Sequence, residues 1–185
     1  MGDDLQKLCG VVGFMFFSKL LNFTMIIKLS DLNYTFTQKP LVVGGRAMEY
    51  YGLRKSGRDI DLIAPSEDIA ALIQLYPERI KDLWGDLGVC PGDYEIWKTI
   101  CLLDYNTLRR GAIELEDVLM ISLERLLHMK ILAISIEKYL QDTKLIVDRM
   151  LKEQYRSYEG IKAENEQILR NVSNVVFIEK RGPNA

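Results

Sequence analysis

Two aspartates separated by one residue are the first candidates for chemistry in this sequence. Asp59 and Asp61 begin the run DIDLI, which has the pattern of a β-strand. Side chains two positions apart share a face of a strand, so we expect both carboxylates to point the same way, with their Cα atoms roughly 7 Å apart. Among apolar neighbours, such a pair requires a cation to offset its repulsion and lost hydration. Mg²⁺ is the natural candidate, because it takes oxygen ligands from one or two carboxylates together with substrate phosphates.

A glycine pair lies upstream of the aspartates, with 13 residues between Gly45 and Asp59. Gly44 and Gly45 have no Cβ, so a substrate phosphate can approach the backbone, and the N–H groups that open a following helix point at such an anion. Together the two pairs predict a site for a metal ion and a phosphorylated substrate. The alternative is that the aspartates only end a strand, which leaves two carboxylates uncompensated among apolar residues.

Residues 41–62 resemble the DNA polymerase beta type nucleotidyltransferase superfamily in their Gly-Gly turn, short helix and Asp-x-Asp strand. Within it, the chain is similar to small bacterial nucleotidyltransferases that include toxin components of abortive-infection and toxin–antitoxin systems. Relatives often carry Ser or Thr two positions before the first aspartate, where this chain has Gly57, with Ser56 one place earlier. A weaker similarity extends over residues 96–148.

The resemblance implies an α/β (α+β) fold with a small mixed β-sheet flanked by helices and further helices at the C-terminus. It also implies transfer of a nucleoside monophosphate from a nucleoside triphosphate to a hydroxyl acceptor on a protein, an RNA or a small molecule. Two Mg²⁺ ions would be held by Asp59, Asp61 and a third carboxylate, while Gly44 and Gly45 would cradle the phosphates. A toxin–antitoxin role and a cytoplasmic location follow from the same resemblance.

In the superfamily, the third carboxylate lies on the neighbouring strand. The aromatic and β-branched segment 94–105 predicts that strand. Asp104 is the best positional match, following two leucines, and would also act as the base toward the acceptor hydroxyl. Counting by two places Glu95 on the opposite face, and it is the alternative if the register differs.

Three cationic side chains are candidates for binding the phosphates. Arg54 and Arg58 lie in the loop before the aspartates, where they would hold the triphosphate or neutralise charge on the transferred group. The alternative for each is a solvated loop. Lys130 falls on the apolar face of a predicted helix, following the lead-in ISLE that recurs in relatives. It either points toward bound phosphate or the acidic cluster, or snorkels to the protein surface.

The remaining pattern predicts elements around this centre. We expect helices over 46–51, 69–76, 122–140, 139–158 and 162–176, strands over 41–43, 59–63, 94–105 and 112–120, and a connecting segment over 77–92. Ser122 is the expected N-cap of the helix that carries Lys130, and His128 is expected at the surface. Gly160 is expected to interrupt the helical pattern.

Composition indicates an ordinary globular chain of 185 residues, 48% hydrophobic and 27% charged. We expect one domain over 1–185, with a core over 30–120, a helical part over 122–176 and a disordered tail over 179–185. The formal charge of -2 gives no general attraction to nucleic acid. Cys9, Cys90 and Cys101 are an odd, widely spaced set, which indicates free thiols in a reducing compartment and no zinc site.

The segment Leu5 to Leu29 is apolar but interrupted by lysines, so no run reaches the ~18 residues needed to span a membrane. Acidic residues near its start also argue against a signal peptide. We expect it to cover the sheet, or to contact a protein partner or a second copy of the chain.

Two alternatives to a transferase stay open. The first is an inactive module of the same fold that binds a nucleotide or a partner. The second is an interaction protein that oligomerises through the segment Leu5 to Leu29.

Overall fold

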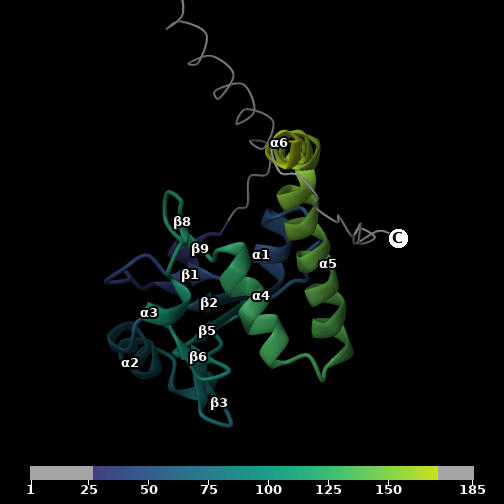
Figure 1. The fold of residues 1–185 in the computed structure, drawn as a ribbon. Coiled ribbons are helices and arrows are strands. Elements are labelled where there is room, and N and C mark those ends of the chain that lie inside the picture. Colours follow the sequence, from purple (N-terminus) through teal and green to yellow (C-terminus); the bar gives the residue numbers. More distant parts are fainter. Residues whose placement is uncertain (1–26, 171–185) are drawn as a thin grey trace, which may run out of the picture. The chain divides into compact units, whose positions relative to one another are not determined.

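The computed structural model describes residues 27–170, which divide into two compact units with the boundary between Ile146 and Val147. The first unit holds the β-sheet and most of the helices (Figure 1). The second contains the end of α5 (Glu137–Gln154), the 3-10 turn η4 (Tyr155–Ser157) and α6 (Tyr158–Arg170). All but the last residues of the segment Leu5 to Leu29 lie outside the described residues, as does the tail 179–185.

The sheet is mixed and has seven strands in the order β3-β4-β5-β2-β1-β9-β8. Their bounds are β1 (Leu41–Val42), β2 (Ile60–Ile63), β3 (Ile80–Leu83), β4 (Asp86–Val89), β5 (Tyr94–Trp97), β8 (Ile113–Glu114) and β9 (Leu119–Met120). The central strand β2 pairs antiparallel with β1 and parallel with β5. The predicted α/β (α+β) class, with a small mixed sheet flanked by helices, is confirmed.

Helices lie on both sides of these strands. In Figure 1, α1 and α4 are seen on one side of the strands, and α2 and α3 on the other. Their bounds are α1 (Gly44–Tyr50), α2 (Ser66–Leu75), α3 (Tyr105–Leu108) and α4 (Leu123–Leu132), and two 3-10 turns cover Leu29–Leu32 and Pro77–Arg79. The core gathers fully buried apolar side chains from the central strands and from α2 and α4, including Leu62, Ile96, Leu72 and Leu126. Burial of these side chains is the main stabilising contribution to the sheet.

The unit from β1 through α1 to β2 matches the sequence expectation closely. Its helix begins at Gly44, two residues earlier than expected, and Gly52 follows the helix with a φ of +67°. A positive φ is readily adopted by glycine, so Gly52 lets the chain leave the helix and return toward β2. This local unit places the glycine pair and the aspartates at one end of neighbouring strands.

The expected strand over 94–105 is wrong, because the chain turns back after β5. A separate two-stranded sheet forms from β6 (Thr99–Ile100) and β7 (Leu103–Asp104). Cys101 and Leu102 have φ values of 51° and 60° between these strands. The Asp86 carboxylate holds the turn by accepting hydrogen bonds from Thr99 Oγ1 and from the backbone N–H groups of Cys101 and Leu102, at 2.7, 2.6 and 3.0 Å. The β-branched pattern gives no sign of this distant acceptor.

Four further features differ from expectation. The expected connection over 77–92 contains the β3–β4 hairpin, and the expected strand over 112–120 is the β8–β9 hairpin. The helix capped by Ser122 ends at Leu132, where short-range backbone hydrogen bonds from Ala133 and Ile134 close its last turn. Gly160 lies within α6 and does not interrupt it. The expectations for Ser122 as N-cap and for His128 at the surface are confirmed.

Candidate active site

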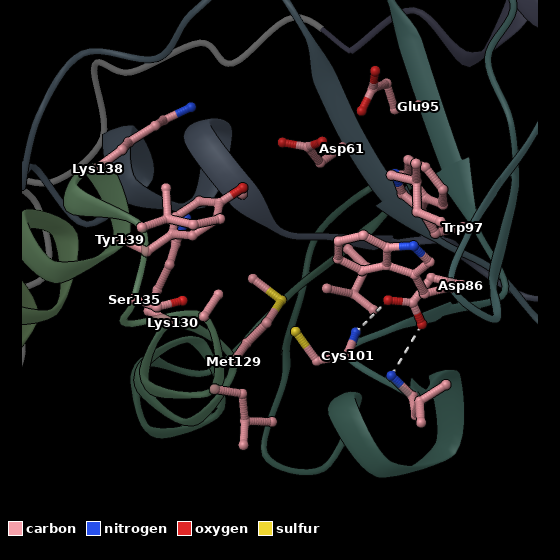
Figure 2. Close-up of a pocket in the computed structure, with 18 of the residues that line it drawn as sticks. Asp61, Asp86, Glu95, Trp97, Cys101, Met129, Lys130, Ser135, Lys138 and Tyr139 are labelled. Carbon is pink, nitrogen blue, oxygen red and sulfur yellow. Dashed lines mark hydrogen bonds between the residues drawn. The ribbon is translucent and has the colours of Figure 1, made fainter.

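A cavity of about 510 Å³ lies between the sheet and the turn that joins α4 to α5. One wall comes from the sheet strands and includes Asp61, Glu95 and Trp97. The opposite wall comes from the helices and includes Met129, Lys130 and Tyr139 (Figure 2). Gly44 and Gly45 also line the cavity. Its volume is in the range of small-molecule sites.

Asp61 and Glu95 are direct neighbours across β2 and β5, where they form a register pair. Both carboxylates therefore lie on the cavity face of the sheet. Burial raises the pKa of Asp61 above its usual value, the nearby charge of Glu95 raises it further, and a hydrogen bond from the Gly45 N–H partly offsets both effects. A half-buried carboxylate beside a second one in a cavity is typical of functional sites.

Asp59 occupies a more open position than Asp61. It precedes β2 in the loop, is exposed to solvent and is absent from the residues that line the cavity. Its negative charge still contributes to the raised pKa of Asp61, although burial and Glu95 contribute more. The structure thus separates the predicted pair into one enclosed and one open carboxylate.

Gly44 leaves room for the Asp61 carboxylate. Its φ is +60°, and a Cβ built on Gly44 would overlap the carboxylate oxygen Oδ2 of Asp61. Gly45 differs, because a Cβ built there would meet the backbone N of Gly57 no closer than 3.6 Å, an ordinary contact. The two glycines therefore have different roles: Gly44 provides space for a carboxylate, and Gly45 donates a backbone N–H to it.

This difference predicts unequal effects of two matched substitutions. We expect Gly44→Ala to push Asp61 out of place and to weaken Mn²⁺ binding at least tenfold, whereas Gly45→Ala should change it less than threefold, because only the first Cβ collides with the site. Mn²⁺ binding measured by electron paramagnetic resonance is the test. Equal affinities in the two variants would contradict the assigned role of Gly44.

Lys81 supplies a cation that the sequence did not predict. Its Nζ lies 2.8 Å from Glu95 Oε1, reaching from β3 across β4 to β5. The intervening position on β4 is Gly88, where a Cβ would overlap the Trp97 indole. Gly88 thus lets the large ring of Trp97 lie against β4 on the same face as Glu95. The sequence does contain a signal for this hairpin: apolar and polar residues alternate on either side of the Trp84-Gly85 turn. This signal lies within the segment that we expected to be a connection.

Lys130 is buried and does not snorkel, since its side chain is only 4% exposed. Its Nζ lies 2.9 Å from Asp142 Oδ2 and 4.5 Å from the centroid of the Tyr139 ring. Burial lowers the pKa of Lys130, and the ion pair with Asp142 opposes that shift. The lysine therefore stands in the cavity wall, held by a carboxylate from α5.

Arg54 binds the same carboxylate. Its Nε and Nη2 lie 2.6 and 2.9 Å from the two oxygens of Asp142, a bidentate pair. Burial opposes ionisation of Asp142, but hydrogen bonds from Arg54 and Lys130 hold its pKa below the usual value. Arg54 consequently ties the loop before β2 to α5 and does not line the cavity. We did not predict Asp142 from the sequence. Helical spacing could have indicated it, because Asp142 shares a buried stripe with Thr143 and Ile146.

Two more predicted site residues, besides Asp59 and Arg54, do not line the cavity. Asp104 is exposed and caps α3, accepting a hydrogen bond from the Thr107 N–H at 2.8 Å, beside a separate hollow of about 110 Å³. The turn after β5 is the reason, because it removes Asp104 from the main sheet. Arg58 is 81% exposed and pairs with Asp93 at 2.8 Å. Glu95, the alternative third carboxylate, is the one that reaches Asp61.

The donor set suits a metal ion that also binds phosphate. Among residues 27–170, no group of three His, Cys, Asp or Glu side chains is placed to hold a metal ion by itself. Asp61 and Glu95 offer two carboxylates at the cavity. Mg²⁺ commonly binds through one or two carboxylates and completes its shell with water and substrate phosphates. These residues therefore fit Mg²⁺ together with a phosphorylated ligand better than a closed protein cage.

Comparisons with protein-family models, with curated proteins and with solved structures give no match for this chain. The resemblance of residues 41–62 to nucleotidyltransferases therefore stays a prediction. Within the described part of the chain, every helix is too short or too polar to cross a membrane.

Proposed function

We propose that the protein is a Mg²⁺-dependent nucleotidyltransferase that moves a nucleoside monophosphate from a nucleoside triphosphate to a hydroxyl acceptor. The observation that carries the proposal is the register pair of Asp61 and Glu95 in a cavity beside the Gly44-Gly45 turn. The resemblance to the DNA polymerase beta type superfamily supports it, because Glu95 occupies the neighbouring strand where that superfamily places its third carboxylate.

The proposed roles follow from position. Asp61 and Glu95 would hold Mg²⁺, with Asp59 adding negative charge from the open side. A bound Mg²⁺ supplies charge neutralisation on the transferred phosphoryl group and orients it for in-line attack. Gly45 positions Asp61 through its backbone N–H, and its missing side chain leaves room for the phosphates to approach. Of the described carboxylates that line the cavity, Asp86 is engaged by hydrogen bonds in the turn after β5. Asp61 and Glu95 remain, so we propose one protein-held ion in place of the expected two.

Cationic groups on the opposite wall complete the phosphate site. Lys130 and Lys138 line the cavity, and Figure 2 shows both on the side facing Asp61 and Glu95. In the proposed complex they attract the triphosphate and offset charge on the leaving pyrophosphate. Arg54 acts indirectly, because it positions Asp142, which in turn holds Lys130.

A second candidate is a catalytically inactive module that binds a nucleotide or a partner protein. The observation that favours it is Lys81, which already neutralises Glu95 at 2.8 Å. In that case the cavity would bind a nucleotide without any need for Mg²⁺, and the biological effect would not depend on Asp61.

Nucleotide binding and transfer together test the proposal. Each of the four ribonucleoside triphosphates is titrated calorimetrically into the full chain, with Mg²⁺ and then with EDTA, and α-labelled nucleotide is used to follow transfer to protein, RNA and small molecules in an extract. Metal-dependent binding of a nucleotide together with transfer supports the transferase. Binding that ignores EDTA, without transfer, supports the inactive module. No binding of any nucleotide would indicate structural carboxylates.

A further inference from the structure

Trp84 occupies a backbone position that does not suit it. It forms the two-residue turn of the β3–β4 hairpin with Gly85, between the paired residues Leu83 and Asp86. Both turn residues have positive φ, 55° for Trp84 and 97° for Gly85. Turns of this type favour Asn-Gly, and a bulky residue with positive φ is disfavoured. Turn formation therefore does not explain why tryptophan is present here.

Solvent exposure makes the same residue stand out a second time. The Trp84 side chain is fully exposed, although tryptophan has the largest apolar side chain and other large apolar side chains of this protein are buried in the core. A bulky non-glycine residue held in a sparsely populated backbone conformation points to a function at that position. The hydrogen bond from the Gly85 N–H to Asp82, at 2.8 Å, fixes the tip of the hairpin that carries the ring.

Trp84 stands at the edge of the cavity that contains Asp61. The chain has two tryptophans, Trp84 and Trp97, and both line this cavity. Apolar side chains accompany them, among them Leu102, Met129 and Ile136. Figure 2 shows Trp97 and Met129 in the same cavity as Asp61 and Glu95. The cavity therefore combines a charged region, suited to phosphates and metal, with an aromatic region suited to a flat ring.

We propose that Trp84 and Trp97 form an aromatic subsite that stacks on the nucleobase of the nucleotide bound by the charged region. This inference rests on the proposed function, since it assigns the base of the same substrate. Stacking on tryptophan accepts any base, because every base has a π-face, and it favours the larger purines over pyrimidines. The shared location of the charged and aromatic groups selects a phosphorylated ring compound over an apolar protein segment.

The test uses two matched substitutions in the full chain. Trp84→Asn removes the ring and installs the residue that the turn prefers, so the hairpin is retained. Ile113→Asn removes an exposed apolar side chain from β8, away from the cavity, as the control. The probes are an α,β-methylene analogue of ATP, the corresponding analogue of CTP, inorganic tripolyphosphate and adenosine, each with Mg²⁺. Calorimetry gives affinities, and intrinsic tryptophan emission reports on stacking.

We expect the ATP analogue to quench tryptophan emission and to bind more tightly than the CTP analogue. Trp84→Asn should weaken binding of the ATP analogue by between about fivefold and 150-fold, the range for one lost stack. Tripolyphosphate affinity should not change, the melting temperature should not fall, and Ile113→Asn should behave like the original protein. Unchanged affinity for the ATP analogue in Trp84→Asn overturns the aromatic subsite.

Adenosine and tripolyphosphate separate this inference from the proposed function. If adenosine binds and Trp84→Asn weakens it, while Mg²⁺ and tripolyphosphate bind nowhere, the ring site stands and the transferase proposal fails. If Mg²⁺-dependent tripolyphosphate binding is present but the ATP analogue binds no more tightly than tripolyphosphate, the phosphate site stands and the aromatic subsite is overturned.

Discussion

We expect the Asp61→Asn variant to lose Mg²⁺-dependent nucleotide binding while the fold becomes more stable. Asp61 is the enclosed carboxylate of the pair in the cavity, so its loss removes charge where a metal ion would bind. Substituting a residue that only supports a metal ligand lowers metal affinity 10–100-fold. Because Asp61 would be a ligand itself, we expect its substitution to lower the affinity more than about 100-fold. Calorimetric titration with Mg²⁺ and nucleoside triphosphate measures it.

The stability change has a sign that follows from the pKa. Burial raises the pKa of Asp61 above its usual 3.8, and Glu95 adds to that shift, so the folded protein binds this proton more tightly than the unfolded chain. The stability that this bound proton adds to the fold is therefore fully present below pH 3.8 and is lost as pH rises through the folded-state pKa. At pH 7 the ionised group lowers stability, and asparagine removes that cost. Thermal unfolding should show a higher melting temperature for Asp61→Asn at pH 7 and convergence of the two proteins in acid.

Asp104→Asn is the matched control for this experiment. It replaces the carboxylate that the sequence favoured but that the structure places at the start of α3. Asparagine also caps helices, so we expect both folding and nucleotide binding to survive. Equal binding in Asp61→Asn and the original protein would contradict the proposed site, and a loss in Asp104→Asn alone would return the third carboxylate to Asp104.

The largest loss of stability is expected for Asp142→Asn. Asp142 is 1% exposed and pairs with both Arg54 and Lys130, so the substitution leaves a buried lysine without its counter-charge. Breaking a buried ion pair on one side costs about 3–5 kcal/mol. Urea unfolding at pH 7 measures the difference. Because the pKa of Asp142 is lowered on folding, its contribution is present above the usual carboxyl pKa and is lost as pH falls through the folded-state value.

Asp148→Asn on the same helix provides the comparison. Among residues 27–170, Asp148 pairs only with Lys152, and both side chains are mostly exposed, so we expect a change within about 0.5 kcal/mol. Similar losses of stability in the two variants would show that any Asp→Asn change in this helix has the same cost. The ion pairs of Asp142 with Arg54 and Lys130 would then add no stability of their own.

Local patterns predicted the parts of this fold that depend on neighbouring residues. Strand, glycine turn, helix and strand over residues 41–63 are short-range features, and so is the Ser122 cap. The site contains pairings that cross long stretches of chain, such as Arg54 with Asp142, 88 residues apart. The prediction for Asp104 was wrong for the same reason. The Asp86 carboxylate holds a turn that takes the chain out of the main sheet before Asp104. Periodicity describes which face a side chain takes, but it does not identify the partner on that face.

Gly44 and Asp61 share one small volume, since a side chain on the first would occupy the space of the carboxylate on the second. Evolutionary change at these positions is therefore coupled. A lineage that keeps the acidic group at position 61 is confined to glycine at position 44, whereas one that has lost the acidic group is free to replace the glycine. Sequence drift at position 44 would then mark descendants in which the site has fallen out of use.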